Sequence, residues 1–400
     1  MKIALIHNLK PIVKKKELPP DYYSECDSAK TIASITAALR KGQHKVIAVE
    51  ADRDLPIWLA KNPVDLAFNI AEGFDGEARE ARVPALLELM EIPYTGSGVP
   101  ALALAMDKAK SKQIFRHAGV PTPNFQLFGH PDEPLDGRLK YPLIVKPNRE
   151  GSAKGIFASS VVASGSALRV QVRRVFEAYN QEALVEEYIE GTELTVGILG
   201  EDQVLPVLEI DFSECGPSGE FFYSWRMKEF QGNKKMHLTP RFWCPGRLSP
   251  AVTQAVQSVA WKAAKSLGTR DVARVDIRLS SDGIPYVLEV NPLPGIDPEE
   301  SNLPIMLKAA RISYGAFVQK LVMLAMERSL TQAKVQISSY IPSSNSMVPD
   351  IAVPNRRALP GSVGQRRGRP ETPAVVIRNR EPKRRPEGRN NDPKEGNLGR

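Results

Sequence analysis

The sequence predicts an α/β fold divided among more than one domain. Strand-like and helix-like segments alternate along residues 1–330, and the order strand–helix–strand–helix at the start is typical of a parallel sheet. The chain has 400 residues, whereas one domain usually holds about 100–200, so two or three domains are expected.

Residues 1–96 are predicted to form a Rossmann-like N-terminal domain with a small parallel sheet. The helix expected over 27–42 has apolar residues at helical spacing, with a cap at Asp27 and Gly42 as its terminator. The other elements expected in this domain are strands at 2–7, 44–51 and 64–73 and a helix at 79–91.

Residues 97–182 are predicted to form a second part that carries a polar loop between two strands. Strands expected at 141–148 and 156–162 flank a glycine-bearing loop at 149–155, which is the pattern of a hairpin. Helices are expected at 106–120 and 164–180.

Residues 183–330 are predicted to form a third part in which antiparallel strands dominate. A hairpin over 273–295 turns at residues 281–283, where Ser-Asp-Gly is a typical turn sequence. The other elements expected here are strands at 182–189, 193–200 and 204–212 and helices at 249–268 and 302–330.

The positive charge of the protein is concentrated in its last fifty residues. The whole chain has a net charge of +8. Residues 351–400 hold 13 Lys and Arg against five Asp and Glu, which is also +8, so residues 1–350 are neutral. From residue 331 the sequence shows no sustained helical or strand period, and we expect 331–400 to be a disordered tail rich in Arg and Pro. Any affinity for polyanions therefore belongs to this tail.

Composition argues against a membrane-spanning or secreted protein. No apolar run approaches the roughly 18 residues that span a bilayer, and lysines follow the first apolar run instead of preceding it. Cys26, Cys215 and Cys244 lie far apart, without the spacing of a zinc site or a disulfide framework. A cytoplasmic protein without a membrane span is expected.

Three oxygen-bearing side chains are predicted to meet on one face of the 273–295 hairpin. Glu289 and Asn291 are two residues apart and leave the same face of their strand, and Asp276 lies across the turn. Carboxylate and amide oxygens suit Mg²⁺, which usually completes its coordination with phosphate oxygens. Arg274 shares the face of Asp276, where it can stabilise a developing anion. The alternative is a surface hairpin whose acids are only solvated.

Two lysines on separate elements, Lys108 and Lys146, are candidate ligands of phosphate. Lys146 follows an apolar strand, and the loop 149–155 after it offers backbone amides and small residues that can close over a phosphate. Lys108 lies near the start of a helix, where a solvated surface is the more common environment. A purely structural role is an open alternative for both lysines.

A glutamate-rich hinge follows, in which Glu186 and Glu193 bracket a turn at Gly191. A strand that leaves a sheet into such a loop can present backbone groups to an adenine edge and a carboxylate to ribose hydroxyls. A plain acidic turn is the alternative.

The order of these features resembles the ATP-grasp superfamily, and within it the D-alanine–D-alanine ligase group. The resemblance covers about residues 1–328, and its most specific stretches are 85–112, 145–155, 186–200 and 273–295. It implies that 1–96 is a pre-ATP-grasp domain, and that 97–182 and 183–330 are the central and C-terminal subdomains of an ATP-grasp fold.

The resemblance implies a role for each matching residue. The residues implied to bind ATP are Lys108, Lys146, Glu186, Glu187, Tyr188, Ile189 and Glu193. Those implied in catalysis are Arg274, Lys228, and Ser152 in the closing loop. Asp276, Glu289 and Asn291 would hold two Mg²⁺ ions, which Mn²⁺ can replace. Gly295 and Ser301 would hold the carboxylate of the second substrate.

The implied reaction joins a carboxylate to an amine at the expense of ATP, through an acyl phosphate, with release of ADP and phosphate. Many members of the group form homodimers through the first domain, so a homodimer is an open alternative. The competing function is a non-catalytic ATP-grasp scaffold whose basic tail binds polyanions.

The first-substrate region departs from the family pattern. No glutamate falls in register with the one that binds the first D-alanine, although Glu25 is near, and Glu72 replaces the family's histidine as the expected substrate-binding residue. The tyrosine that pairs with the serine of the glycine loop is absent, and Trp225 and Trp243 near Lys228 are either walls of the substrate site or core residues. The substrates are therefore D-alanine, another amino acid or a peptide.

Overall fold

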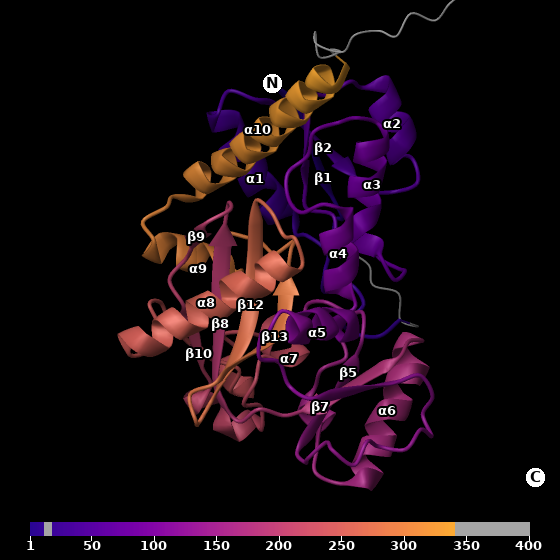
Figure 1. Ribbon diagram of the computed structural model, residues 1–400, viewed down its shortest axis with the longest axis vertical. Helices are drawn as coiled ribbons and strands as arrows, with labels where there is room; N and C mark the ends of the chain where they lie inside the picture. Colours follow the sequence, from indigo (N-terminus) through magenta and orange to yellow (C-terminus); the bar gives the residue numbers. More distant parts are fainter. Residues whose placement is uncertain (12–17, 341–400) are drawn as a thin grey trace, which may run out of the picture. The chain divides into compact units, whose positions relative to one another are not determined.

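The computed structural model describes residues 1–11 and 18–340 of the chain. These residues belong to one compact unit. Three sheets lie in the described part, and they follow one another along the sequence (Figure 1). The predicted α/β class is confirmed, because the first sheet is parallel and helices cover the faces of the sheets.

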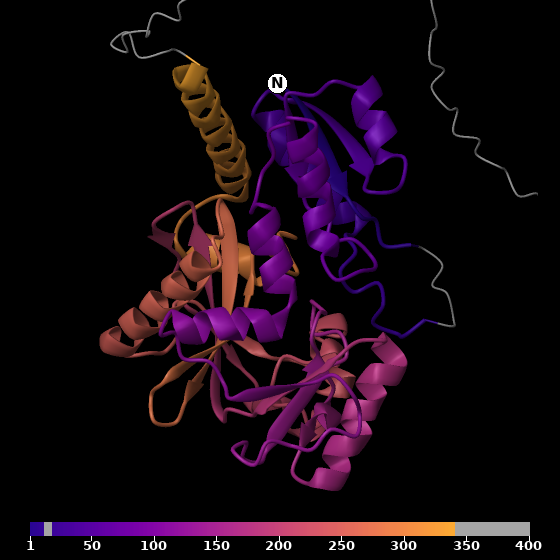
Figure 2. The ribbon, with the colours of Figure 1, turned by 45° about the vertical axis from the view of Figure 1, so that its right-hand side comes forward.

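The N-terminal sheet has the strand order β2-β1-β3, and both pairs are parallel. Alternation along β1 divides its side chains between two cores. Ile3 and Leu5 pack with residues of α1 and α10, whereas Ala4 and Ile6 pack with residues of α2 and α3. Figure 2 shows this N-terminal part in indigo and violet. The elements are β1 (Lys2–His7), α1 (Ala29–Lys41), β2 (Lys45–Glu50), α2 (Leu55–Lys61), β3 (Leu66–Asn69), a 3₁₀ turn η1 (Arg79–Ala81) and α3 (Arg82–Leu89).

The helix predicted over 79–91 is divided, because its first residues form the 3₁₀ turn η1. Pro84 at the third position of α3 fits this boundary, since proline is tolerated only in the first turn of a helix. The turn also places Arg79 and Glu80 in the interior, where both are buried.

The second sheet has the order β4-β7-β5-β6 and is antiparallel. Leu168 and Val172 of α6 pack on Leu143 and Val145 of β5. β7 pairs in this sheet, although the predicted boundary at 182–183 assigns it to the next part. The elements are α4 (Val99–Met106), α5 (Lys108–His117), β4 (Phe125–Phe128), β5 (Leu143–Pro147), η2 (Ala158–Ser160), β6 (Val161–Val162), α6 (Gly165–Tyr179) and β7 (Ala183–Glu187).

The strand predicted over 156–162 is much shorter than expected. Only Val161 and Val162 pair with β5, and the residues before them form the 3₁₀ turn η2. The Ser160 hydroxyl accepts a hydrogen bond from the Phe157 amide at 3.0 Å, which competes with strand pairing.

The third sheet has the order β11-β10-β8-β12-β13, and β9 adds to β8. α8 covers one face, where Val256 and Ala260 pack on Val275 and Ile277. The strand predicted over 204–212 is interrupted at Pro206, which lacks an amide hydrogen. The elements are β8 (Gly191–Leu199), β9 (Gln203–Val204), β10 (Leu208–Asp211), η3 (Ser213–Ser218), α7 (Trp225–Glu229), η4 (Lys234–Met236), β11 (Arg241–Trp243), α8 (Pro250–Ser266), β12 (Val272–Ser280) and β13 (Pro285–Asn291).

The helix predicted over 302–330 is two helices, α9 (Asn302–Ala309) and α10 (Tyr314–Tyr340). The break contains Arg311, whose φ of 60° cannot continue a right-handed helix. α10 passes the predicted end at residue 330, so residues 331–340 are helical and not disordered. The rest of the predicted tail lies outside the described residues. Within the described ranges, no helix combines the length and hydrophobicity needed to cross a bilayer.

Candidate functional site

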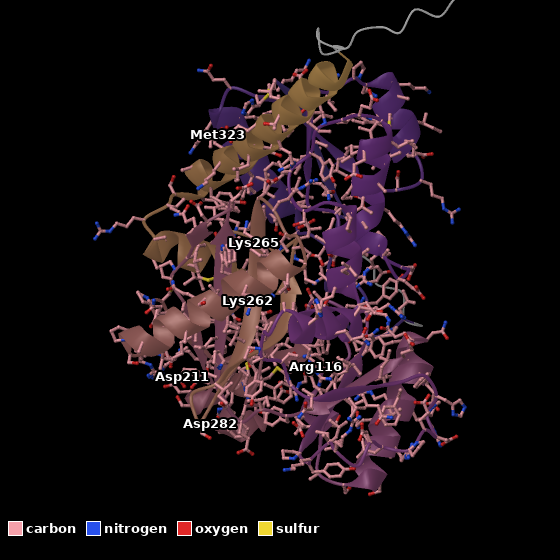
Figure 3. The ribbon with its side chains drawn as sticks, viewed as in Figure 1. Arg116, Asp211, Lys262, Lys265, Asp282 and Met323 are labelled. Atoms are coloured by element: carbon pink, nitrogen blue, oxygen red, sulfur yellow. The ribbon has the colours of Figure 1, made fainter. Side chains whose placement is uncertain are left out.

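The hairpin of β12 and β13 brings the predicted oxygen donors together. Asp276 pairs with Glu289 across the two strands, and Arg274 pairs with Asn291. The Asp276 carboxylate accepts hydrogen bonds from Arg274 at 2.9 and 2.8 Å and from the Asn291 amide at 3.1 Å. Figure 3 marks Asp282 in the turn of this hairpin. The predicted meeting of these side chains on one face is therefore found in the structure.

Glu289 lies in a ring of cations. Lys108 Nζ is 3.4 Å from its carboxylate, and Lys108 itself is buried and not a solvated helix residue. Burial alone would raise the pKa of Glu289, but Lys108, Lys228 and Lys146 together hold it well below its ordinary value. Glu289 is therefore ionised at neutral pH.

The donor set on the hairpin fits a hard divalent cation. Asp276 and Glu289 supply carboxylate oxygens and Asn291 an amide oxygen, which is the chemistry that Mg²⁺ prefers. Asp276 shares its charge with Arg274, and Glu289 shares its charge with Lys108. Because two carboxylates face more than two cations, phosphate oxygens can complete the coordination of a cation held here.

A cavity of about 90 Å³ lies beside this hairpin. Lys108, Lys146 and Lys228 line it together with Asp276 and Glu289. Most of the residues predicted to bind nucleotide also line it, namely Glu186, Glu187, Tyr188, Ile189 and Glu193. Apolar side chains complete the walls: Ile144, Ile156, Leu194, Ile210, Phe222 and Leu288.

The carboxylate of Glu186 lies between two lysines. Lys146 donates to one of its oxygens, and Lys112 Nζ is 2.9 Å from the other. Glu186 is 1% exposed, and Lys112 is 0% exposed. Burial lowers the pKa of Lys112 to about 8. Sequence reasoning missed Lys112, although its spacing of four residues from Lys108 places the two on one side of a helix.

Arg278 is a second residue of the site that was not predicted. It donates to Glu193 at 2.8 Å, to the Tyr188 hydroxyl at 2.6 Å and to the Ile189 carbonyl at 3.0 Å. These three partners come from the segment predicted to face adenine and ribose. The signal was present in the sequence, because Arg278 is two residues from Asp276 and shares its strand face.

The glycine loop is held both by the N-terminal segment and by the site, where Lys108 donates to the Glu150 carbonyl. Glu25 accepts a hydrogen bond from the Gly151 amide at 2.8 Å and forms ion pairs with Arg79 at 2.6 Å and Lys154 at 3.3 Å. Burial would raise the pKa of Glu25, but Arg79 and Lys154 lower it. Ser152 has a φ of 49° and is not among the residues that line the cavity, although Glu150 and Ala153 of the same loop are.

Glu72 is half-buried and lies near two buried acids, Glu25 and Glu80. Burial, followed by repulsion from Glu25 and Glu80, raises the pKa of Glu72 well above its ordinary value. Burial and Glu25 also raise the pKa of Glu80, to about 8. Neither Glu72 nor Glu80 lines the nucleotide cavity. The charges of Lys108 and Glu289 also act on Glu80. Glu80 therefore lies between this group of acids and the residues of the hairpin site.

Gly295 and Ser301 lie together at the start of α9. A side-chain carbon at Gly295 would be 3.0 Å from the Ser301 hydroxyl, and that hydroxyl accepts a hydrogen bond from the Asp297 amide at 3.0 Å. The next residue, Asn302, lines the cavity. The predicted second-substrate residues are therefore next to the site, although neither lines the cavity.

Lys228 lies on the short helix α7, which closes one side of the cavity. Its ammonium is 5.2 Å from the centre of the Tyr223 ring. Burial and the nearby Arg274 lower the pKa of Lys228. The Ser224 hydroxyl caps the helix by accepting from the Met227 amide at 3.0 Å, which fixes the direction of α7.

Comparison with known proteins agrees with this geometry. A family model described as the C-terminus of D-ala D-ala ligase matches residues 114–323. The chain is 36% identical over 311 residues to a D-alanine–D-alanine ligase of Carboxydothermus hydrogenoformans, across 75% of this chain and 94% of that one. It is 33% identical over 305 residues to the uncharacterized protein y4sG of Sinorhizobium fredii, across 74% of this chain and 87% of that one.

A solved structure supports the same assignment. The crystal structure of D-alanine–D-alanine ligase from Bacillus anthracis complexed with ATP matches with a TM-score of 0.65 and 26% identity, over 83% of this chain and 99% of that chain. Sequence, fold and the charged cavity point to one group of proteins. The chain belongs to the D-alanine–D-alanine ligase family of ATP-grasp proteins.

Proposed function

We propose that the protein is an ATP-dependent ligase that joins a carboxylate to an amine and forms a peptide bond. The observation that carries this proposal is the convergence of Lys108, Lys146 and Lys228 with Asp276 and Glu289 around one cavity. Three lysines that line one cavity suit a triphosphate, and two carboxylates suit the cation that accompanies it.

The chemistry begins with the carboxylate of the first substrate. One of its oxygens attacks the γ-phosphorus of ATP, the bond from that phosphorus to ADP breaks, and an acyl phosphate forms. The amine of the second substrate then attacks the acyl carbon and loses a proton, and phosphate leaves with the former carboxylate oxygen. Arg274 would stabilise the oxyanion of that step, since it is half-buried and already oriented by Asp276.

Asp276, Glu289 and Asn291 would hold Mg²⁺, in two ions as the resemblance implies, with Mn²⁺ as a substitute. The cation supplies charge neutralisation to the transferring phosphoryl group. The lysines contribute further positive charge, and burial strengthens each of these interactions relative to water.

We propose that the first substrate differs from the one that the family pattern implies. Glu25, the acid nearest to the expected ammonium-binding position, is occupied by Arg79 and Lys154. Glu72 remains as an ionisable side chain in this region and is our candidate for the first-substrate contact. D-alanine, another amino acid and a peptide are all compatible with this arrangement.

We also propose a cytoplasmic location, because the reaction requires ATP. A homodimer is a further prediction, which sedimentation of the purified protein would test. The scaffold function with a polyanion-binding tail is the second candidate, motivated by the charge of residues 351–400.

The test is a phosphate-release screen with Mg²⁺-ATP against D- and L-amino acids and dipeptides, alone and in pairs. We expect phosphate only when a suitable carboxylate is supplied, and a loss of at least about 100-fold in Glu289→Gln. Asp282→Asn, in the exposed turn of the same hairpin, is the matched control and should keep full activity. An equally active Glu289→Gln variant would refute the ligase assignment. Phosphate release without amide formation from any pair of substrates would also refute it.

A further inference from the structure

Two segments from distant parts of the sequence form walls of the nucleotide cavity. The glycine loop contributes Glu150 and Ala153, Ile156 follows that loop directly, and the segment leading into α7 contributes Phe222 and Tyr223. Contacts between these two walls therefore decide how firmly they are held together beside the cavity.

Trp225, the first residue of α7, makes the direct contacts between the two walls. Its backbone amide donates to the Ile156 carbonyl at 3.0 Å, and its ring meets the Phe157 ring edge-on at 5.8 Å between centroids. The Trp225 side chain is only 8% exposed. Lys228 lies three residues later on the same helix, so the position of Trp225 sets the position of that lysine.

The same tryptophan also reaches the N-terminal segment. Its indole nitrogen donates to the Ser24 hydroxyl at 2.9 Å, across 201 residues of sequence. The neighbouring Glu25 holds the Gly151 amide at 2.8 Å, and Asp21 holds the Gly155 amide at 2.7 Å. One short segment, residues 21–25, therefore binds the glycine loop directly and binds α7 through Trp225.

We propose that Trp225 and Ser24 form the latch that holds α7 and the glycine loop closed over the acyl phosphate. Trp225 is then a positioning residue, which acts through Lys228 and through the exclusion of water. The latch would take the place of the tyrosine that the family pattern pairs with Ser152, because this sequence lacks that tyrosine. The effect of the latch on catalysis rests on the proposed ligase function, whereas its effect on the two walls does not.

The chemical consequence follows from the intermediate. If the walls open before the amine attacks, water attacks the acyl carbon, phosphate leaves, and the original carboxylate is restored. ATP is then consumed without formation of an amide. A loosened latch should therefore raise the amount of phosphate released per amide formed, because water reaches the acyl carbon before the amine does.

The first test compares Trp225→Phe and Ser24→Ala. Phenylalanine keeps an aromatic ring against Phe157 but has no donor for Ser24, and Ser24→Ala removes the acceptor alone. With Mg²⁺-ATP and the best substrate pair from the screen, we expect each variant to release about five times more phosphate per amide than the wild type. The double variant should be no worse than either single one, because both remove the same hydrogen bond.

The control is Trp261→Phe. Trp261 lies on α8, is 41% exposed, and donates to the Glu201 carbonyl at 3.4 Å, away from the cavity. This variant should keep the ratio of phosphate to amide of the wild type. Additive effects of Trp225→Phe and Ser24→Ala, or a wild-type ratio in both, would overturn the latch.

A second measurement needs no activity and separates the latch from the ligase assignment. Amide hydrogen exchange of residues 149–157 in the nucleotide-free protein should be about five times faster in Trp225→Phe than in Trp261→Phe. Faster exchange without any amide product would support the latch and refute the ligase function. Unchanged exchange in this loop would refute the latch whatever the protein ligates.

Discussion

Two carboxylates at the centre of the site are shared between lysines. Glu186 lies between Lys112 and Lys146, and Glu289 is drawn to Lys108 at 3.4 Å with further lysines nearby. One carboxylate cannot neutralise two ammonium groups. The ammonium groups around Glu186 and Glu289 can therefore accept further anionic partners, such as the oxygens of a polyphosphate.

The first prediction concerns Glu186. Glu186→Gln leaves Lys112 and Lys146 buried together without their counter-ion, and we expect it to lower the free energy of unfolding by about 3–5 kcal/mol. Urea denaturation measures this change. Glu190→Gln, four residues away and exposed, should change the stability by less than about 0.5 kcal/mol. Equal stability of the two variants would mean that the buried charges are compensated elsewhere.

The second prediction concerns the pH dependence of stability. Burial, followed by repulsion from Glu25, raises the pKa of Glu80 to about 8 from its ordinary value of 4.5. Between these values the folded protein binds more protons than the unfolded chain, so Glu80 makes the free energy of unfolding fall as the pH rises. Glu80→Gln should remove this fall and exceed the wild type by roughly 2–4 kcal/mol near pH 8.

Urea denaturation at several values between about pH 5 and about pH 8 measures the effect of Glu80→Gln. Glu77→Gln is the control, because Glu77 lies three residues before Glu80 and is exposed. It should keep the slope of the wild type. A Glu80→Gln variant that loses stability with pH as steeply as the wild type would show that Glu80 is ionised in the folded protein.

At the scale of elements, pattern and motif predicted the hairpin of β12 and β13 well. The direct pairing of Asp276 with Glu289 depends on a register shift between Asp276 and Ile277, which local patterns did not indicate. Alternation along β13 does fix the shared face of Glu289 and Asn291, and the turn at 281–283 brings Asp276 near them. The same reasoning placed Lys146 at the end of a strand. Resemblance to a family supplied the remaining nucleotide contacts, since their positions depend on elements far apart in the sequence.

Long-range contacts were beyond the reach of local patterns. Nothing in the sequence around Arg79 indicates that it occupies Glu25, because the two residues meet only after the N-terminal segment folds back on η1. The contact of Trp225 with Ser24 spans 201 residues and is invisible for the same reason. The over-long strand at 156–162 failed differently, since the 3₁₀ turn at Ser160 overrode its β-branched sequence.

The third prediction concerns the junction of β8 and β12. Gly191 has a φ of +144°, and a side-chain carbon there would lie 2.0 Å from the Leu279 carbonyl oxygen. Backbone atoms cannot move aside cheaply, so Gly191→Ala should lower the free energy of unfolding by about 1–3 kcal/mol. It should also weaken ATP binding, because Glu193 follows two residues later in the same strand.

Thermal denaturation and isothermal titration with Mg²⁺-ATP measure the two effects of Gly191→Ala. Gly216→Ala is the matched control, because no atom lies within 4 Å of a side-chain carbon at that position. It should leave both quantities unchanged. If Gly191→Ala is destabilised but binds ATP with full affinity, this junction contributes to folding and not to nucleotide binding.

At the scale of the whole molecule, α10 ties the first sheet to the third. Gln319 donates to the Ala38 carbonyl of α1 at 2.9 Å, and Arg328 pairs with Asp271, just before β12, at 2.5 Å. Arg328 also donates to the Tyr94 carbonyl at 2.7 Å. This helix, which was predicted to end at residue 330, is therefore part of the body through at least Arg328, and any truncation must leave it whole.

The last prediction concerns the basic tail. Deletion of residues 351–400 removes a net charge of +8 and leaves α10 intact, so turnover and thermal stability should equal those of the full chain. Retention on a heparin column should fall to a lower salt concentration, because the remaining residues carry no net charge. Replacing Arg366, Arg367, Arg384 and Arg385 with glutamine keeps the length of the chain and should reduce retention in the same direction.

Lost turnover in the deletion would show that the tail contributes to the ligase body. Unchanged retention would instead remove the electrostatic reason for assigning polyanion binding to the tail.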